Sequence, residues 1–294
     1  MKNRTIQSIE YGQPMNMGGF PIRQALPSVN VDMLDPFLLL HHAKIDVAKD
    51  ADLKNAGVGA HPHRGFSPVT FIFEGGVHHR DSRGNDHIVY AGGTQWMNAG
   101  MGLIHSERPP ADIHDLGSKQ ELIQLWINSP AKNKMDAPVY LPLTKDDTPT
   151  LISEDQATTI QVIAGSLAEL KGPIIPQSPI NMFTIKMKAG ATYFIPFEST
   201  HQAFIYVLNG LVSLSESSNT NNALIKANYM AILHRDGDGI NIIALEDSLM
   251  LMGTGEPLNE PVASHGPFVM NNQTEIMEAF RDYQMGKMGV LIED

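Results

Sequence analysis

The chain has 294 residues, no cysteine, and 21 basic against 32 acidic residues, which gives a formal net charge of −11. The absence of cysteine excludes disulfides, thiolate nucleophiles and cysteine-bound metal sites. An acidic surface repels phosphate backbones, so we expect no direct nucleic-acid binding. There is no apolar run long enough to cross a membrane and no signal-like N-terminus, which predicts a cytoplasmic protein without membrane contact.

The first half of the chain has the pattern of short β-strands. Residues 37–40 form an apolar run, and His41 and His42 follow it, one expected to be packed and the other exposed. Residues 69–74 are mostly β-branched or aromatic and stop at two glycines. Further strands are expected at 77–81, 86–90, 94–99 and 121–128. Strands at intervals of about 8–12 residues, with glycine-rich turns, indicate an antiparallel barrel or sandwich.

The second half begins after a segment of different composition. Residues 129–149 are rich in proline, lysine and aspartate and are interpreted as a linker, in which 139–141 pairs briefly with a sheet. We therefore expect two domains, at 1–135 and 136–294. Near the end, residues 272–284 have apolar residues at helical spacing. Asn272 is the expected N-cap with Glu275 three residues later, and Gly286 is the expected C-cap.

An internal repeat relates the two halves. Residues 71–75 and 206–210, offset by 135 positions, are both apolar strands that end at a glycine. Residues 95–97 and 229–231 correspond roughly at a similar offset. We therefore predict an all-β protein of two tandem antiparallel β-barrels of one design, with a short C-terminal helix.

Two pairs of polar residues in the first half have the spacing of metal ligands. His61 and His63 form one i, i+2 pair, and His105 and Glu107 form the other. On a strand this spacing places both side chains on one face, because successive residues alternate sides. On neighbouring strands the pairs would bring three imidazoles and one carboxylate to a single point. The offset of 135 places Pro196, Glu198, Ile240 and Ile242 at the same positions in the second half, so no metal site is expected there.

Such a ligand set carries one negative charge and suits Fe(II), Mn(II), Ni(II), Co(II), Cu(II) or Zn(II) rather than Ca(II) or Mg(II). Four protein ligands leave coordination positions for a substrate or dioxygen. Glu107 has two alternative roles, as a ligand only or also as a base that takes a proton from a bound hydroxyl group. Either His78 or His79 faces inward by alternation and could hydrogen-bond a ligand, although a solvated position is the simpler interpretation of each. Arg64 and Asp81 form an ion pair or are two separate surface charges.

Several motifs resemble those of the pirin family of the cupin superfamily. They lie at residues 34–40, 61–66, 74–82, 95–100, 105–107, 255–262 and 266–271, and so span nearly the whole chain. The resemblance implies a bicupin with metal only in the N-terminal barrel, bound by His61, His63, His105 and Glu107, with iron as the usual metal. The family often has Glu-Thr where this chain has residues 67–68, and Pro-Gly-Asp where it has residues 91–93. Both departures are expected to affect the pocket and its substrate preference.

The family resemblance implies two kinds of function. Some pirins resemble quercetin 2,3-dioxygenases, which favours a mononuclear, metal-dependent dioxygenase acting on a flavonol-like aromatic substrate and O2, with Glu107 as the catalytic base. Others are iron-dependent transcriptional cofactors or bind metabolic enzymes, which favours a non-enzymatic iron-binding regulatory protein with a protein partner. A third alternative is another cupin reaction, such as isomerisation, at the same site. We expect a monomer.

Overall fold

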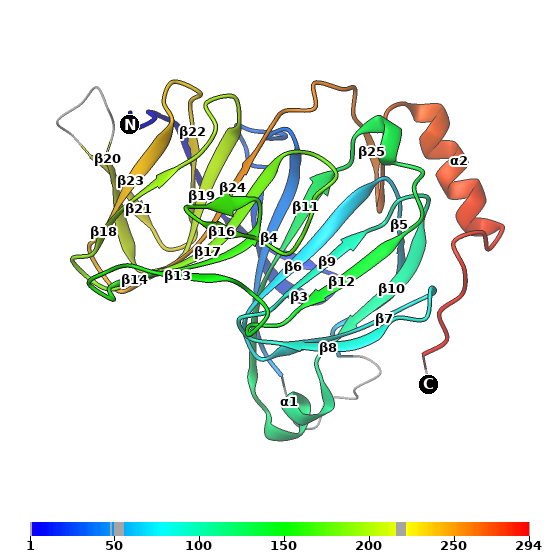
Figure 1. Ribbon diagram of the computed structural model, residues 1–294. Helices are drawn as coiled ribbons and strands as arrows, with labels where there is room; N and C mark the ends of the chain where they lie inside the picture. Colours follow the sequence, from blue (N-terminus) through cyan, green and yellow to red (C-terminus); the bar gives the residue numbers. More distant parts are fainter. Residues whose placement is uncertain (1, 48, 50–55, 216–221, 294) are drawn as a thin grey trace. The chain divides into compact units, whose positions relative to one another are not determined.

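The computed structural model describes residues 2–47, 49, 56–215 and 222–293. Those residues form mainly antiparallel strands, with two short helices and one 3-10 turn. The expected all-β fold with a short C-terminal helix is confirmed (Figure 1). No helix in the described ranges is both long and apolar enough to cross a membrane.

The chain divides into two compact units that exchange their terminal segments. Unit 1 consists of Met1–Pro14, Arg23–Pro36 and Asp146–Leu258, and unit 2 of Met15–Ile22, Phe37–Lys145 and Asn259–Asp294. This division differs from the expected one at 1–135 and 136–294. The reason is long-range pairing, because the N-terminal strand completes a sheet of unit 1 and the C-terminal segment packs on unit 2.

Unit 2 contains the predicted metal ligands. The seven-stranded sheet formed largely by unit 2 has the order β12 (Val139–Leu143), β9 (Thr94–Asn98), β6 (Phe66–Glu74), β11 (Lys119–Asn128), β4 (Phe37–Asp46), β3 (Phe20–Leu26) and β2 (Gln13–Met17). Its four-stranded sheet has the order β5 (Val58–His63), β10 (Leu103–Arg108), β7 (Gly76–Asp81) and β8 (Asp86–Tyr90). The pairing of β12 with β9 confirms the short strand expected in the linker.

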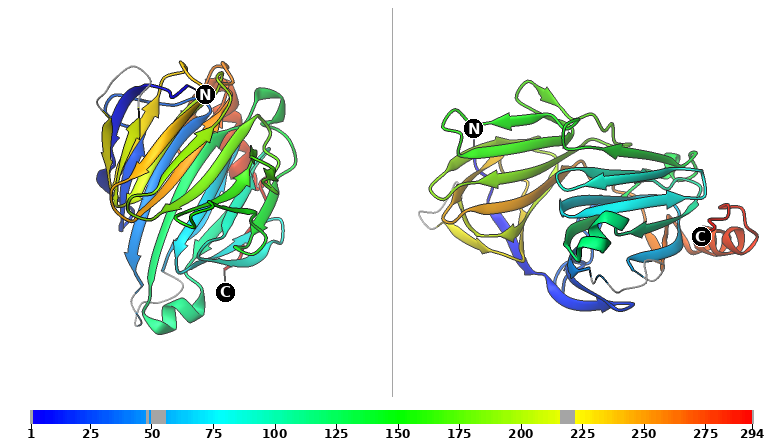
Figure 2. Two further views of the ribbon diagram at one scale, coloured as in Figure 1. Left: turned by 60° about the vertical axis from the view of Figure 1, so that its left-hand side comes forward. Right: turned by 90° about the horizontal axis from the view of Figure 1, so that it is seen from below.

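Unit 1 has the same set of sheets. Its seven-stranded sheet has the order β1 (Ile6–Tyr11), β22 (Tyr229–Leu233), β19 (Gln202–Asn209), β24 (Ser248–Gly255), β17 (Ile180–Met187), β14 (Thr158–Ala164) and β13 (Thr150–Ile152). Its four-stranded sheet has the order β18 (Thr192–Pro196), β23 (Gly239–Ala244), β20 (Leu211–Ser215) and β21 (Ala223–Lys226). A small hairpin, β15 (Ser166–Leu167) with β16 (Leu170–Lys171), completes it. Figure 2 shows these strands from two further sides.

The strand orders of the two units correspond position by position. In the larger sheets β9, β6, β11 and β4 match β22, β19, β24 and β17, and β1 occupies the place that β12 has in unit 2. In the smaller sheets β5-β10-β7-β8 matches β18-β23-β20-β21. Gly75 and Gly210 end the equivalent strands, and both have a positive φ that a side chain would strain. The predicted repeat of one barrel design is therefore confirmed.

The remaining elements, two helices, a 3-10 turn and a short hairpin, belong to unit 2. Helix α2 (Gln273–Gln284) begins as expected, because the Asn272 side chain accepts a hydrogen bond from the Glu275 N–H at 3.0 Å. Gly286, in the left-handed region, follows its end. The sequence pattern did not predict helix α1 (Ala111–Leu116) or the 3-10 turn at Ala131–Asn133. The hairpin of β25 (Ala263–His265) and β26 (Phe268–Met270) packs against α2.

Candidate metal centre

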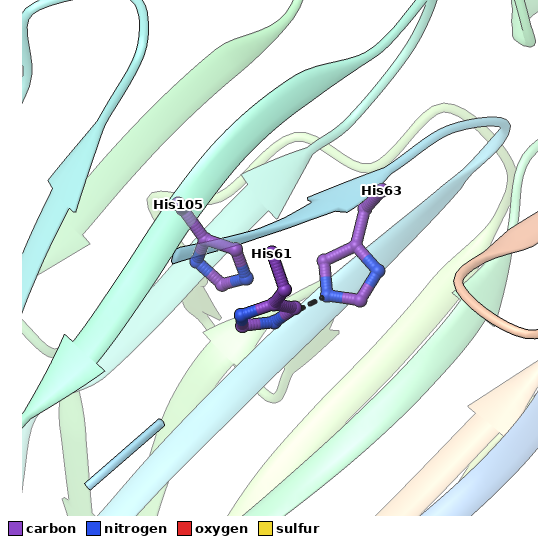
Figure 3. A group of neighbouring side chains, drawn as sticks. All are labelled: His61, His63 and His105. Carbon is purple, nitrogen blue, oxygen red and sulfur yellow. Dashed lines mark hydrogen bonds between the residues drawn. The ribbon is translucent and has the colours of Figure 1, made fainter. Parts of the chain in front are cut away.

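Three of the four predicted ligands meet inside unit 2. Strands β5 and β10 pair with His61 opposite His105 and with His63 opposite Leu103, two positions along. Alternation along each strand then places the three imidazoles on one face. One ring nitrogen of each histidine lies within 4.8 Å of those of the other two. Figure 3 shows the three rings turned toward one another.

Hydrogen bonds to backbone carbonyls fix the tautomers of the first two histidines. His61 Nδ1 lies 2.8 Å from the carbonyl oxygen of Gly59, and His63 Nδ1 lies 3.4 Å from that of Pro267. A carbonyl only accepts, so in each ring Nδ1–H donates and the neutral ring keeps its lone pair on Nε2. The two Nε2 atoms are nevertheless 3.1 Å apart. Two lone pairs at that distance repel unless a cation lies between them.

A buried chain of side chains fixes the third tautomer in the same way. Asp81 Oδ2 accepts from His79 Nε2 at 3.0 Å, which leaves the lone pair of His79 on Nδ1. That atom is 3.4 Å from His105 Nδ1, which therefore donates to it. His105 Nε2 keeps the lone pair, is buried, and has no hydrogen-bond partner within the described part of the chain. A carboxylate or carbonyl behind each histidine is the usual arrangement of metal-bound imidazoles.

Burial favours the neutral form of two of these rings, His63 and His105. His63 and His105 are each about 2% exposed, and desolvation lowers the pKa of both well below the ordinary range, with further lowering from neighbouring histidines. A neutral imidazole is the form that binds a metal. Three rings with converging Nε2 lone pairs, two of them buried, are a donor set that fits a divalent transition metal, and the identity of that metal is open.

The fourth predicted ligand, Glu107, lies beside this cluster but not within it. Its carboxylate is not among the potential ligand atoms that gather within 4.8 Å of one another. Thr70 Oγ1 donates to Glu107 Oε1 at 2.7 Å, and Gln124 Nε2 donates to Oε2 at 2.7 Å. Trp126 Nε1 in turn donates to Gln124 Oε1 at 3.0 Å. Both carboxylate oxygens are therefore oriented, and each retains a second lone pair.

A largely apolar cavity of about 240 Å³ opens onto His61, His63 and Glu107. Its lining includes aliphatic and aromatic side chains of β3, β4 and β11, and it contains no lysine or arginine among the described residues. His41 also lines it, and burial lowers the pKa of that ring to about 4, so it is neutral at physiological pH. The full lining is Met17, Phe20, Ile22, His41, Ala43, Ile45, Gly57, Val58, His61, His63, Val77, Glu107, Gln120, Leu122, Gln124, Trp126 and Pro267.

The structure settles the alternatives that the sequence left open for residues around the site. Between the two candidate histidines, His79 is the inward one and His78 bonds Asp86 at 2.6 Å near the surface. Neither alternative for Arg64 and Asp81 holds: the Arg64 guanidinium donates to Asp282 on α2 at 3.1 Å, and both side chains are buried instead of solvated. Residues 67–68 and 91–93, where the chain departs from the family pattern, do not line the cavity.

The equivalent positions of unit 1 carry no ligands. Strand β23 pairs with β18 through Ile240 and Ile195, where unit 2 has His105 and His61. In β20 and β23, Leu214 pairs with Ile242 as His79 pairs with Glu107. These residues and Phe197, which continues β18 at the position of His63, all belong to one buried apolar core. The pairing places Ile195 and Phe197, rather than Pro196 and Glu198, at the positions equivalent to His61 and His63, a shift of one residue along β18.

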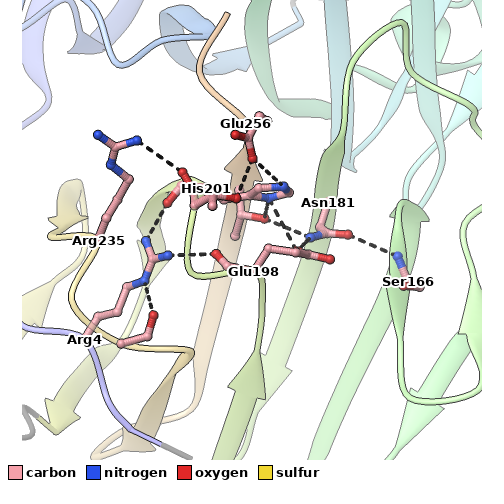
Figure 4. Close-up of polar contacts among 10 residues, drawn as sticks. Arg4, Ser166, Asn181, Glu198, His201, Arg235 and Glu256 are labelled. Atoms are coloured by element: carbon pink, nitrogen blue, oxygen red, sulfur yellow. Dashed lines mark hydrogen bonds and ion pairs between the residues drawn. The ribbon is translucent and has the colours of Figure 1, made fainter.

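Unit 1 has its polar network elsewhere, outside that core. His201 Nδ1 is 3.0 Å from Thr254 Oγ1, and Asn181 Nδ2 donates to both Thr254 and Glu198. The Arg4 guanidinium donates to the carbonyl oxygens of Glu198 and His201 (Figure 4). Among the described residues no group of three potential metal ligands includes His201.

Comparison with known proteins identifies the family. The family model described as Pirin matches residues 19–127, and the Pirin C-terminal cupin domain matches residues 182–289. A Pseudomonas aeruginosa protein named "Putative quercetin 2,3-dioxygenase" is 35% identical over 275 residues, which is 92% of each chain. A crystal structure named quercetin 2,3-dioxygenase from Acinetobacter baumannii is 34% identical, with a TM-score of 0.90 over 99% of this chain and 100% of its own.

A more distant solved structure shares the fold. It is a bacterial pirin from Escherichia coli in complex with nickel(II), 19% identical, with a TM-score of 0.66 over 85% of this chain and 99% of its own. The repeated barrel, the three-histidine cluster that the described residues form in one copy, and the two family models that match most of the chain agree with one another. This chain therefore belongs to the pirin family.

Proposed function

We propose that this protein is a metal-dependent dioxygenase of the quercetin 2,3-dioxygenase type. It would open a flavonol-type ring at one metal ion held by His61, His63, His105 and Glu107. The observation that carries the proposal is the convergence of three Nε2 lone pairs beside an apolar cavity that Glu107 also lines. The names of the similar proteins support the same reaction class.

The cavity favours a flat, uncharged aromatic substrate. Its walls are mostly apolar and include Trp126 and Phe20. An anionic substrate would find no cationic side chain there, because the lining contains no lysine or arginine among the described residues and His41 is neutral. Burying an unpaired carboxylate or phosphate is costly, so such substrates are disfavoured.

Glu107 has two alternative roles in this proposal, as a metal ligand or as the acceptor of a substrate proton. A bound divalent metal would supply a Lewis acid that favours ionisation of a substrate hydroxyl and brings dioxygen to the same place. The free lone pairs of the Glu107 carboxylate either bind that metal or accept the hydroxyl proton. Thr70 and Gln124 orient the carboxylate, which lines the same cavity as His61 and His63. Trp126 holds Gln124 in turn.

The test measures oxygen uptake and carbon monoxide release with quercetin. We expect the Fe(II)-loaded protein to consume oxygen and release carbon monoxide. A Glu107→Gln variant should retain bound metal and lose most of the turnover. A His105→Ile variant, treated with the same iron, measures the background oxidation of quercetin. Fully metal-loaded protein whose uptake equals that background would contradict the proposal.

The same measurements separate the alternatives. Turnover of quercetin or a related enol without oxygen consumption would favour an isomerase-like cupin reaction. Tight metal binding without any turnover would favour a metal-responsive regulatory protein, and pull-down with and without chelator would then test for a partner that depends on the metal.

A further inference from the structure

Strand β5, which carries His61 and His63, is an edge strand with a β-bulge. In its pairing with β10, His61 lies opposite His105, but Val58 lies opposite Glu107. Two residues of β5, Gly59 and Ala60, therefore face a single residue of β10. A bulge of this kind re-aims the side chain beside it and is common next to functional sites. Here that side chain is His61.

Both residues of the bulge make specific hydrogen bonds. The carbonyl oxygen of Gly59 accepts from His61 Nδ1 at 2.8 Å, which sets the tautomer of that ring. The N–H of Ala60 donates to Glu293 Oε2 at 3.1 Å. Among the strands that the structure describes, β5 pairs only with β10 in its sheet, which leaves its other edge without a neighbouring strand of that sheet. A side chain from the C-terminus of the chain supplies an acceptor for the bulge.

Glu293 is itself fixed to the neighbouring ligand strand. Arg108, the last residue of β10, donates from Nε to Glu293 Oε1 at 3.1 Å and from a terminal nitrogen to Oε2 at 3.0 Å. Another nitrogen of Arg108 donates to the carbonyl oxygen of Ala56 at 2.8 Å. The ion pair is partly buried, with the two side chains 16% and 22% exposed. Bidentate pairs of this kind are directional as well as strong.

The segment between α2 and Glu293 follows strand β10 along its length. At one end the Met288 carbonyl accepts from Ser82 Oγ at 2.7 Å, and the buried Met288 side chain lies over Gly102, just before β10. At the other end Glu293 bonds Arg108, where β10 stops. Figure 1 shows this red segment descending from α2 on the side of unit 2.

We propose that the C-terminal tail, residues 289–293, is a clamp that positions His61 for metal binding, with Glu293 joining the bulge of β5 to the end of β10. Without that clamp the Ala60 N–H would bond to solvent water, and the bulge would be free to move along β5 and change the register of β5 on β10. A slip of one residue moves strand side chains to the opposite face, which would turn His61 away from His63 and His105. The proposal rests on the metal site of the proposed function, but not on the dioxygenase reaction.

The experiment measures the affinity for Co(II), whose visible absorption reports the ligand geometry, together with its release rate to a chelator. Glu293→Gln removes the charge with little change of shape. Because Glu293 supports the strand that carries His61 and does not contact the ring itself, we expect Co(II) binding to weaken by about tenfold, the lower end of the loss seen when a ligand loses its own hydrogen-bond partner. Deletion of 289–294 should weaken it by at least as much. Glu278→Gln, at an exposed position on α2, is the matched control and should bind like wild type.

A double-mutant cycle distinguishes positioning of His61 from a general loss of stability. In a His61→Ala background the Glu293→Gln change should have no further effect on Co(II) affinity. Wild-type affinity and spectrum in both tail variants would overturn the proposal, as would an equal loss in the presence and absence of His61. If the wild-type protein binds Co(II) but does not oxidise quercetin, the proposed reaction fails while the clamp is still tested. If the wild-type protein binds no Co(II), both the site and the clamp are overturned.

Discussion

The two barrels have the same strand order, but the interior of unit 2 holds a cluster of polar side chains where that of unit 1 is apolar. At the place where unit 2 has His61, His63, His105 and Glu107, unit 1 has Ile195, Phe197, Ile240 and Ile242. The supporting residues change as well. Thr70 and Gln124 pair in unit 2 as Ile205 and Met252 pair in unit 1, and Leu214 stands where unit 2 has His79.

The difference shows that the metal site is a set of side chains and not a property of the barrel. Each apolar side chain buried in unit 1 stabilises the fold by about 1.5–3 kcal/mol. Polar side chains at the same positions give up that contribution and require partners for every buried polar atom. In unit 2 those partners are Asp81, the Gly59 carbonyl, Thr70 and Gln124, and the remaining lone pairs of the three histidines point to one place. Exchanging residues between equivalent positions therefore tests each role.

The largest effect is expected from His105→Ile, which introduces the side chain of Ile240. It removes a buried ligand, so metal affinity should fall by more than about a hundredfold, beyond the effect of an outer partner. Metal content after purification and a titration with Ni(II) would measure it. His234→Gln, at an exposed position of unit 1, should leave the metal content unchanged. Equal metal content in both variants would show that the site lies elsewhere.

The reverse exchange, Ile240→His, should not create a site in unit 1. It places an imidazole without partners in an apolar core, and we expect a loss of about 3 kcal/mol in the free energy of unfolding. Ile240→Val, which only shortens the side chain, should cost about 1 kcal/mol. Urea unfolding of both variants gives the comparison. If Ile240→His were as stable as Ile240→Val, the interior of unit 1 would be less closed to water than its buried core indicates.

His79→Leu, which copies Leu214, tests the chain that fixes the His105 tautomer. Without the acceptor Nδ1 of His79, His105 is free to place its proton on Nε2, so metal affinity should fall by about 10–100-fold. His78→Leu changes the adjacent residue, which bonds Asp86 near the surface, and should have no such effect. A metal titration with both variants would decide, and equal affinities would contradict the assignment.

Gln124→Met, which copies Met252, tests the orientation of Glu107. Loss of the hydrogen bond to Oε2 frees the carboxylate to rotate, so kcat with quercetin should fall by about tenfold while metal content is maintained. Steady-state oxygen uptake and metal analysis of the same sample measure the two effects separately. A parallel loss of metal would instead make Gln124 part of the structural support of the site.

The smallest effect concerns pH and the polar network of unit 1. Burial lowers the pKa of His201, although Glu198 and Glu256 act in the opposite direction. The unfolded chain then binds a proton more readily than the folded one, so His201 should reduce stability as the pH falls below the ordinary histidine pKa of about 6.5. Urea unfolding near neutral pH and near pH 5 should show a smaller acid loss for His201→Gln than for wild type. His234→Gln, at the exposed histidine, should behave like wild type.

Patterns between residues close in the sequence were sufficient to predict most of the fold and most of the metal ligands of this protein. Alternation predicted the strands and placed His61 and His63 on one face, and the spacing of glycines and apolar residues predicted a repeated barrel with ligands in one copy only. The N-cap of α2 at Asn272 was also predictable from the sequence, because capping depends on residues three positions apart.

Only the tertiary structure decided how the site is held. The partners of His79, the hydrogen bonds of Glu107 and the position of Glu293 join residues that are far apart in sequence. The exchange of terminal segments between the units is of the same kind. Periodicity fixes which face a side chain occupies within a strand. Which strands become neighbours, and where a bulge shifts their register by one residue, follows from closure of the whole barrel.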